Sequence, residues 1–325
     1  MKKRQRSEAK AKCASSAKRT TSWRDIDFPK CERKVHKLQV RIAKAQKEGR
    51  RNKVKALRHL LVTSYEAKVL AVRKVTSNKG KRTAGVDHIK WDTDVKKIKA
   101  VSSLKRRGYK ALPLKRVNIP KSNGKMRPLG IPTMKDRAMQ ALYLMALEPV
   151  TDMEADANSY GFRRHRGTAD TIDALHRWLS RDCSPQWILE GDIKGRFDHI
   201  NHEWLLDNIR IDRQILDKWL KSGVVFNKLH QPTTEGTPQG GIISPTLANA
   251  TLDGMERMLK EKYKVKSVER KLYHPKVNLV RYADGLHRHC RQEGNIGGDK
   301  GHVDGLPRQA WSHALRRKDS DNAYR

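Results

Sequence analysis

The sequence has few cysteines and no long apolar run. Its cysteines are scattered without the paired spacing of a zinc site: Cys13, Cys31, Cys183 and Cys290. We therefore expect reduced thiols and a cytoplasmic protein, because disulfides persist mainly in oxidising compartments. No apolar stretch approaches the roughly 18 residues that a membrane span needs, and no signal peptide opens the chain, so we expect no membrane partner.

Acidic residues are also scarce. The chain has 325 residues, with 35 Asp and Glu against 71 Lys and Arg, which gives a formal net charge of +36. An excess this large attracts polyanions and argues against an ordinary small-molecule enzyme. The charge therefore indicates a nucleic-acid partner, without distinguishing RNA from DNA.

The N-terminal third combines high positive charge with helical periodicity. Residues 1–20 contain almost no large apolar side chain, which predicts a disordered basic arm. We assign residues 21–105 to a basic helical extension, with two amphipathic helices separated at Gly49. Their expected core positions are Val35, Leu38, Ile42, Ala45, Val54, Leu57 and Leu61. The outer faces carry Lys and Arg, which favours phosphate contact over a plain solvated surface.

Residues 106–285 mix strand and helix signals. Ser122-Asn123-Gly124 is typical of a hairpin turn, so Lys121 and Arg127 should lie on neighbouring strands. Other strands are expected at 187–191 and 277–283, and helices at 134–150, 168–180, around 202–222 and from Pro245. The first two of these helices should be largely buried. The mixture predicts an α+β fold in which helices pack on an open sheet.

Two aspartates follow predicted strands. Asp192 comes after the strand at 187–191, and Asp284 follows the strand at 277–283. Two carboxylates on adjacent strands can hold Mg²⁺, and a pair of such ions can activate a 3′-hydroxyl and stabilise departing pyrophosphate. An aspartate after a strand is also a common turn or N-cap residue, so neither aspartate alone decides the matter.

Five sequence blocks in order suggest a specific family. They are Arg127-Pro128-Leu129-Gly130-Ile131-Pro132, Ser159-Tyr160-Gly161-Phe162-Arg163, Glu190-Gly191-Asp192-Ile193-Lys194-Gly195-Arg196-Phe197-Asp198, Gly236-Thr237-Pro238-Gln239-Gly240-Gly241-Ile242-Ile243-Ser244-Pro245 and Arg281-Tyr282-Ala283-Asp284. Over roughly residues 20–285 the chain resembles the group II intron-encoded reverse transcriptases. The resemblance implies a right-hand polymerase with fingers and palm, preceded by the basic helical extension.

The resemblance also implies a metal site and a nucleotide site. Asp192, Asp284 and the backbone carbonyl of Ile193 would hold two Mg²⁺ ions. Phe197 would be a steric gate whose ring leaves no room for the 2′-hydroxyl of a ribonucleotide.

Three further side chains are implied in nucleotide binding. Lys121 and Arg127 would clamp the incoming triphosphate, although a generic RNA-facing surface would look the same in sequence. Gln239 and its neighbouring glycines would let the backbone approach the new base pair, although a plain Pro-Gly turn is the simpler interpretation. We expect Asp198 to have a supporting role.

The chain departs from the family at Gly285. The family has a second aspartate there, and residues 286–290 lack strand alternation, so we expect the hairpin to be lost. A metal site at His287, His289 and Cys290 would lack the second, suitably spaced group of ligands that a zinc site needs. Removing one nucleotide from the Gly285 codon lets the shifted frame encode an aspartate, an alternating strand and a further family block. We therefore predict that residues 286–325 are out of frame and non-native, leaving an incomplete palm, marginal stability and little polymerase activity.

Two functions remain open at this point. One is RNA-directed DNA synthesis of the group II intron type, with an intron RNA template, a DNA primer, dNTPs and Mg²⁺. The other is a non-catalytic, maturase-like RNA-binding fragment. A ribosome-associated basic protein would explain the charge but none of the ordered blocks.

Overall fold

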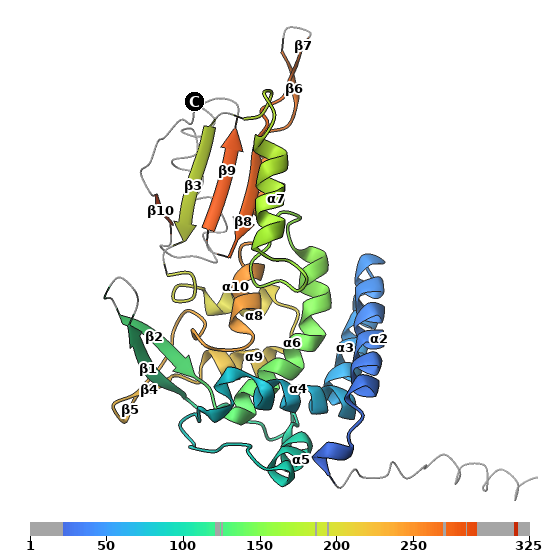
Figure 1. The fold of residues 1–325 in the computed structure, drawn as a ribbon, viewed down its shortest axis with the longest axis vertical. Helices are drawn as coiled ribbons and strands as arrows, with labels where there is room; N and C mark the ends of the chain where they lie inside the picture. The colour runs from blue at the N-terminus through green and yellow to red at the C-terminus, as the bar shows by residue number, and fades with distance from the viewer. Residues whose placement is uncertain are drawn as a thin grey trace, which may run out of the picture.

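The protein is an α+β structure, shown here as a computed structural model (Figure 1). The structure describes residues 22–120, 124, 126–185, 187–193, 195–268, 271–283, 285–290 and 315–317. The predicted arm at 1–20 and two predicted site residues, Lys121 and Asp284, lie outside this part of the chain.

The described chain begins with six helical elements, and strands and helices are interspersed from residue 114 onward. The helical elements are η1 (Trp23–Asp25), α2 (Phe28–Lys47), α3 (Arg51–Thr63), α4 (Tyr65–Ser77), η2 (Lys79–Arg82), α5 (Asp94–Ser103), α6 (Met134–Glu154), α7 (Thr168–Leu179), α8 (His202–Asn208), α9 (Arg213–Leu220), α10 (Ser244–Ala250) and α11 (Met255–Lys262). The strands are β1 (Leu114–Pro120), β2 (Met126–Ile131), β3 (Trp187–Ile193), β4 (Val224–Phe226), β5 (Leu229–Gln231), β6 (Lys266–Val268), β7 (Lys271–Tyr273), β8 (Asn278–Tyr282), β9 (Gly285–Cys290) and β10 (Leu315–Arg317).

The two predicted N-terminal helices are confirmed as α2 and α3. The Asp27 side chain caps α2 by accepting a hydrogen bond of 2.8 Å from the Lys30 amide, and the turn to α3 follows at Gly49. Six of the seven predicted core positions are buried, and Leu38 packs against the same core. The helical spacing of apolar residues was enough to predict both helices, because each helix buries one apolar stripe and exposes its charged side chains.

The long helix α6 forms the centre of the main core. Its side chains are buried over almost all of residues 134–147, which is typical of a helix surrounded by other elements. Helices α2, α3 and α4 pack against it, and α6 runs from these helices toward the sheet that contains β3 (Figure 1). It therefore connects the basic extension to the strands that carry the predicted site.

One four-stranded sheet has the order β2-β1-β4-β5. The predicted hairpin is confirmed, because β1 and β2 pair antiparallel with Arg127 opposite Ile119. The pairing continues to Met126 and Pro120, next to the turn. This hairpin positions Arg127 close to the glycine-rich loop described below.

A second four-stranded sheet has the order β10-β3-β9-β8, and helix α7 lies alongside β8 (Figure 1). The prediction that the hairpin after Tyr282 is lost is wrong, since β8 and β9 pair antiparallel from Tyr282 opposite Gly285 to Asn278 opposite His289. The missing alternation of apolar and polar residues at 286–290 did not prevent strand pairing, because backbone groups form the hydrogen bonds of the ladder. β9 pairs with β3 on one side and with β8 on the other.

Two smaller expectations also need correction. Helix α7 is not largely buried: within it only Thr171 and Ala174 are buried, because a single face covers the sheet. Asp192 does not follow its strand but lies within β3, one residue before the strand ends at Ile193.

The second sheet has little core of its own. One cluster joins Ile193 to Leu252, Met255 and Leu279, and another joins Val280 to Tyr160 and Ala174. The main core, in contrast, extends from the first helices to α10. Within the described residues, none of the helices has the length and apolar character needed to cross a membrane.

Candidate active site

The pairing of β3 with β9 determines where the predicted metal ligands meet. Asp192 lies directly opposite Gly285, and Ile193 is the next residue along β3. Asp284 lies outside the described residues, but both of its chain neighbours are described, and Gly285 is the residue opposite Asp192. Residues that are far apart in the chain thus meet at one end of this sheet.

The segment that contains Tyr160 and Gly161 lies along the other edge of β8. The Tyr160 amide donates to the Arg281 carbonyl and the Arg281 amide donates to the Asn158 carbonyl, each at 2.9 Å. A side chain at Gly161 would overlap the backbone nitrogen of Ala283 and lie 2.8 Å from its Cα. Gly161 is therefore needed so that this segment can approach the end of β8.

A buried polar network lies behind the end of β8. The Arg281 guanidinium is 1% exposed and binds the Asp253 carboxylate at 2.6 Å and the Asn249 carbonyl oxygen at 3.2 Å. Arg196 donates to the same side-chain oxygen of Asn249, and the side-chain amide of Asn249 donates to the backbone carbonyl of Gly161 at 2.7 Å. One buried asparagine therefore joins β8, the Gly161 segment and the turn after β3.

Burial dominates the electrostatics of this network. It raises the pKa of Asp253 to about 6, although Arg281 favours the ionised form. Sequence reasoning missed Arg281, Asn249 and Asp253 as supports of the site. A charged Arg281 directly after the apolar Leu279 and Val280 was the available signal, since a buried arginine requires a partner.

The glycine-rich loop folds onto the turn that follows β3. The Thr237 amide donates to the Phe197 carbonyl at 2.6 Å, and the Gly236 amide donates to the Ile200 carbonyl at 2.7 Å. A side chain at Gly236 would lie 2.6 Å from the carbonyl oxygens of both Phe197 and Asp198. This close contact fixes the turn that carries Phe197.

Gln239 connects the fingers-type hairpin to that turn. Its side-chain oxygen accepts a hydrogen bond of 3.0 Å from the Arg127 guanidinium, and its amide nitrogen is 3.3 Å from the Asp198 carboxylate. The Gly130 amide also donates to the Gln239 carbonyl at 2.7 Å. Gln239 is therefore more than a turn residue, and the structure brings Arg127, Gln239 and Asp198 together.

Phe197 lies on the same turn, packed partly against the main core. The Arg196 guanidinium lies 5.5 Å from the centre of the Phe197 ring and 5.3 Å from that of Phe162. Stacking of this kind restrains an aromatic ring that is otherwise half exposed. Phe197 therefore lies on the turn that Gln239 contacts through Asp198, five residues after Asp192.

The residues present can supply oxygen ligands to a divalent cation. Asp192 is exposed, and no described side chain forms an ion pair or hydrogen bond with its carboxylate. The described residues contain no group of three or more acidic, histidine or cysteine side chains able to hold a metal. Mg²⁺ fits such a site nonetheless, since it is commonly held by one or two carboxylates together with substrate phosphates.

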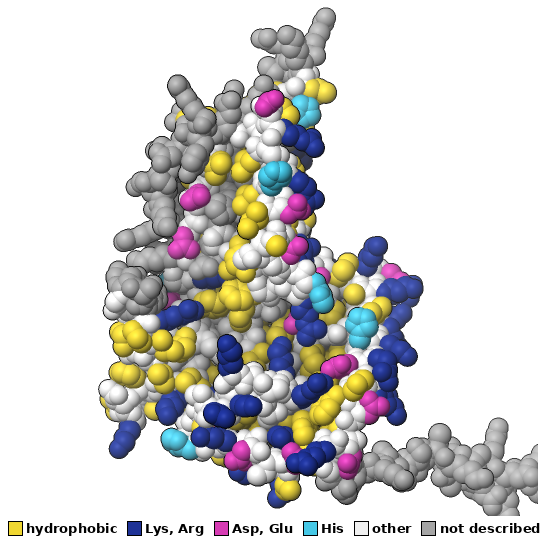
Figure 2. Space-filling view, in the orientation of Figure 1, with side chains coloured by type: hydrophobic (Ala, Val, Ile, Leu, Met, Phe, Trp, Pro, Cys, Tyr) yellow, Lys and Arg dark blue, Asp and Glu magenta, His cyan; other side chains and the backbone are white. Residues whose placement is uncertain are grey.

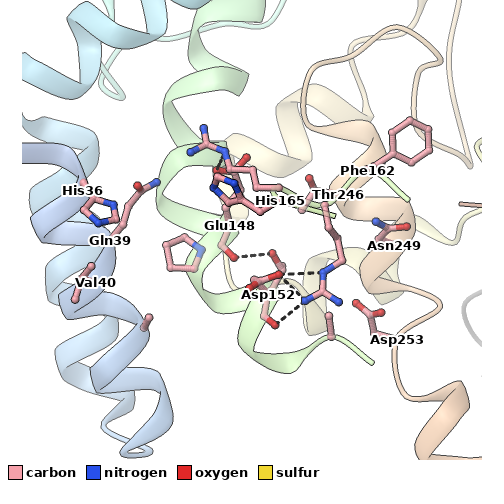
Figure 3. Close-up of a pocket in the computed structure, with 16 residues that line it drawn as sticks. His36, Gln39, Val40, Glu148, Asp152, Phe162, His165, Thr246, Asn249 and Asp253 are labelled. Carbon is pink, nitrogen blue, oxygen red and sulfur yellow. Dashed lines mark hydrogen bonds and ion pairs between the residues drawn. The ribbon is translucent and has the colours of Figure 1, made fainter. Parts of the chain in front are cut away.

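A cavity of about 280 Å³ separates α2 from the loop at 162–165 (Figure 3). Asp152 of α6 binds the Arg163 guanidinium at 2.5 Å, and Glu148 pairs with Arg164 at 3.2 Å. Figure 3 shows His36 and Gln39 of α2 on the opposite side of the cavity. These ion pairs hold the segment after Gly161 against α6. They therefore support the position of Gly161 beside β8.

Comparison with family models identifies the family of this chain. Residues 23–104 match the model of the N-terminal domain of reverse transcriptase. Residues 119–303 match the model of reverse transcriptase (RNA-dependent DNA polymerase). The second match alone covers more than half of the chain, and the chain belongs to the reverse transcriptase family.

Curated relatives narrow the family further. The chain is 38% identical to protein YkfC of Escherichia coli strain K12 over 219 residues, which cover 62% of this chain and 57% of YkfC. It is 37% identical to the group II intron-encoded protein LtrA of Lactococcus lactis subsp. cremoris over 213 residues, covering 62% of this chain and 35% of LtrA. The resemblance to group II intron-encoded reverse transcriptases is thereby confirmed, although the chain spans only part of the length of these relatives.

Similar solved structures are more distant. A partial Cas6-RT-Cas1–Cas2 complex matches with a TM-score of 0.40 and 18% identity, covering 73% of this chain and 38% of that one. An apo telomerase from Candida tropicalis matches with a TM-score of 0.42 and 12% identity, covering 64% of this chain and 50% of that one.

Proposed function

We propose that the chain carries the catalytic centre of a group II intron-type reverse transcriptase, which extends a DNA primer on an intron RNA template with dNTPs. In this proposal Asp192, Asp284 and the Ile193 carbonyl hold two Mg²⁺ ions. Bound Mg²⁺ would lower the pKa of the primer 3′-hydroxyl and neutralise charge on the phosphates. Metal dependence is general in the family.

The observation that carries the proposal is the register that places Asp192 opposite Gly285. This register places the exposed Asp192 beside the first residue of β9, which is the residue after Asp284 in the chain. Among the side chains that the structure describes, none forms an ion pair or a hydrogen bond with the Asp192 carboxylate, as expected of a ligand that binds a cation and a phosphate.

The nucleotide would be held by the β1–β2 hairpin and the turn after β3, which both contact Gln239. Arg127 can donate to the triphosphate, with Lys121 expected to assist from the other strand of the hairpin. Gln239 orients Arg127 through the 3.0 Å hydrogen bond and lies beside the turn of Phe197. Phe197 would then exclude the 2′-hydroxyl of a ribonucleotide.

Primer extension on an RNA template, measured with and without Mg²⁺, tests the proposal. Asp192→Ala should abolish incorporation, while affinity for the RNA template changes little, because one exposed carboxylate contributes little to phosphate binding. Asp207→Ala removes an exposed carboxylate of α8 and is the matched control. Undiminished Mg²⁺-dependent extension by Asp192→Ala would refute the assignment.

A second candidate is a non-catalytic RNA-binding fragment. The net charge of +36 supports it, as do the exposed Lys and Arg side chains that line α2 in Figure 2. RNA binding without Mg²⁺-dependent extension in the unmodified chain would favour this second function. A steep fall of affinity with salt is expected in either case.

A further inference from the structure

Two buried side chains from outside the glycine-rich loop hold its two ends. His202, the first residue of α8, has its Nε2 atom 2.7 Å from the Gly236 carbonyl oxygen. Gln140 of α6 accepts a hydrogen bond of 2.8 Å from the Ile242 amide through its side-chain oxygen. The two side chains are 9% and 3% exposed. The loop is therefore fixed at residues 236 and 242 by helices from two different parts of the chain.

The partner of His202 determines where the imidazole carries its proton. A carbonyl oxygen can only accept, so Nε2 carries the proton and donates it to Gly236. Burial lowers the pKa of His202 below its usual value of about 6.5, so the ring is neutral at pH 7. Gly236 is itself buried, and loss of the ring would leave its carbonyl without this donor.

Gly236 is held on both sides of its peptide unit. Its amide donates to the Ile200 carbonyl at 2.7 Å, and its carbonyl accepts from His202, two residues further along the chain. Its φ of +81° lies in the left-handed region that glycine adopts readily. The segment that carries His202 therefore sets the position and the direction in which the loop begins.

Gln239 lies midway between the two fixed ends, three residues from each. Its side chain accepts the 3.0 Å hydrogen bond from Arg127, and its carbonyl accepts from the Gly130 amide at 2.7 Å. A loop displaced by about 1 Å would stretch the bond to Arg127 beyond the range of about 3.5 Å in which it is effective. The contact between Gln239 and Arg127 thus depends on how the loop is held at its ends.

We propose that His202 and Gln140 are positioning residues for nucleotide binding, because they fix the glycine-rich loop so that Gln239 keeps Arg127 in place for the triphosphate. The inference rests on the proposed function, which assigns Arg127 and Gln239 to the nucleotide site. Each of the two residues acts through the loop and not by contact with the nucleotide. Small displacements of such supports reduce binding and rate strongly.

Affinity for a dNTP tests the inference without requiring catalysis. A DNA primer that ends in a dideoxynucleotide, annealed to an RNA template, cannot be extended but still presents the next template base. Titration of the complementary dNTP with Mg²⁺, followed by the fluorescence of a labelled primer, gives the Kd of the dNTP for the full chain. His202→Leu removes the donor to Gly236 at similar volume, and we expect the Kd to rise about tenfold. Gln140→Met removes the acceptor for Ile242 and should raise the Kd by a similar factor.

Two control variants isolate the hydrogen bond to Gly236. His202→Gln keeps a side-chain N–H donor, so most of the dNTP affinity should be retained. His199→Gln alters an exposed histidine of the same turn, which pairs with Glu235 at 3.2 Å, and should leave the Kd within about twofold. The melting temperature and the affinity for the RNA template show that each variant is folded.

A double-mutant cycle with Gln239→Ala tests whether His202 acts through Gln239. In the Gln239→Ala background, His202→Leu should change the Kd by less than about twofold, because the contact that it positions is already gone. A purely structural role would give the same loss in both backgrounds. If His202→Leu does not fold, Gln140→Met goes through the same cycle.

Three results would overturn the inference. They are an unchanged Kd in the folded His202→Leu and Gln140→Met variants, an equal loss with and without Gln239, and a parent chain that binds no dNTP. Failure of primer extension alone is a different result. It would refute the proposed catalysis, while the dNTP affinities would still report on the loop.

Discussion

Asp192 on β3 lies directly opposite Gly285 on β9, in an antiparallel ladder that extends from this pair to Trp187 and Cys290. Directly opposed residues in such a ladder place their Cβ atoms about 4.5–5.5 Å apart. The position where the family has a second aspartate is therefore within metal-bridging distance of Asp192.

Gly285→Asp should restore a complete metal site. Among the described residues, a Cβ atom at this position would meet nothing closer than the Tyr282 carbonyl oxygen at 3.4 Å, which leaves room for a side chain. Without metal, two opposed carboxylates should destabilise the fold by up to about 1 kcal/mol. Mg²⁺ should then raise the melting temperature of the variant more than that of the parent, and primer extension should increase. Gly285→Asn is the uncharged control, and an equal response to Mg²⁺ in both variants would contradict the prediction.

Gly161→Ala should displace the end of β8. The added methyl group overlaps the backbone of Ala283, which cannot move without breaking the pairing of Tyr160 with Arg281. We expect a loss of about 3 kcal/mol in unfolding free energy, together with loss of extension activity. Gly167→Ala adds the same methyl group where, among the described residues, only the Asp170 carboxylate lies nearby, at 3.8 Å, and it should change stability little. Chemical denaturation of the two variants provides the measurement.

Asp253 should make stability fall as pH rises from about 4 to 6. Its folded pKa of about 6 exceeds the unfolded value of about 3.9, so in this window the folded state binds more protons. The contribution is about 3 kcal/mol, for a difference of about two pKa units. Asp253→Asn cannot titrate, so the stability difference between parent and variant should change across this window. Parallel pH profiles in urea unfolding would show that Asp253 is not the titrating group.

Phe197→Ala should relax the discrimination between dNTPs and rNTPs. Removing the ring opens space for a 2′-hydroxyl, and we expect the ratio of kcat/KM for dNTP over rNTP to fall at least about tenfold, or about 1.4 kcal/mol. Phe162→Ala removes the other ring beside Arg196 and is the control. An unchanged ratio in single-nucleotide incorporation would argue against a gate at Phe197.

The departure at Gly285 predicts a one-nucleotide frameshift. Sequencing the gene from codon 275 to beyond codon 325 should reveal a shifted frame that encodes a second aspartate and an alternating strand. We expect the frame-restored protein to extend primers faster than the present chain under identical conditions. A gene sequence that does not permit this shifted reading would remove the basis of the hypothesis.

Local patterns were read correctly from the sequence wherever one segment decides its own structure. Apolar spacing identified α2 and α3, and Asn123-Gly124 identified the β1–β2 hairpin. The ordered blocks identified the family. The lack of apolar and polar alternation at residues 286–290 wrongly predicted the loss of the hairpin, because strand pairing depends on backbone partners contributed by β3 and β8.

By itself the sequence determined the charge, the helical extension, the hairpin of Arg127 and the family. Only the tertiary structure decided that Asp192 faces Gly285, that Gln239 joins Arg127 to Asp198, and that Arg281 is buried against Asp253 and Asn249. Periodicity reports which face of a segment is buried, whereas these contacts depend on strand register and on how distant elements pack together.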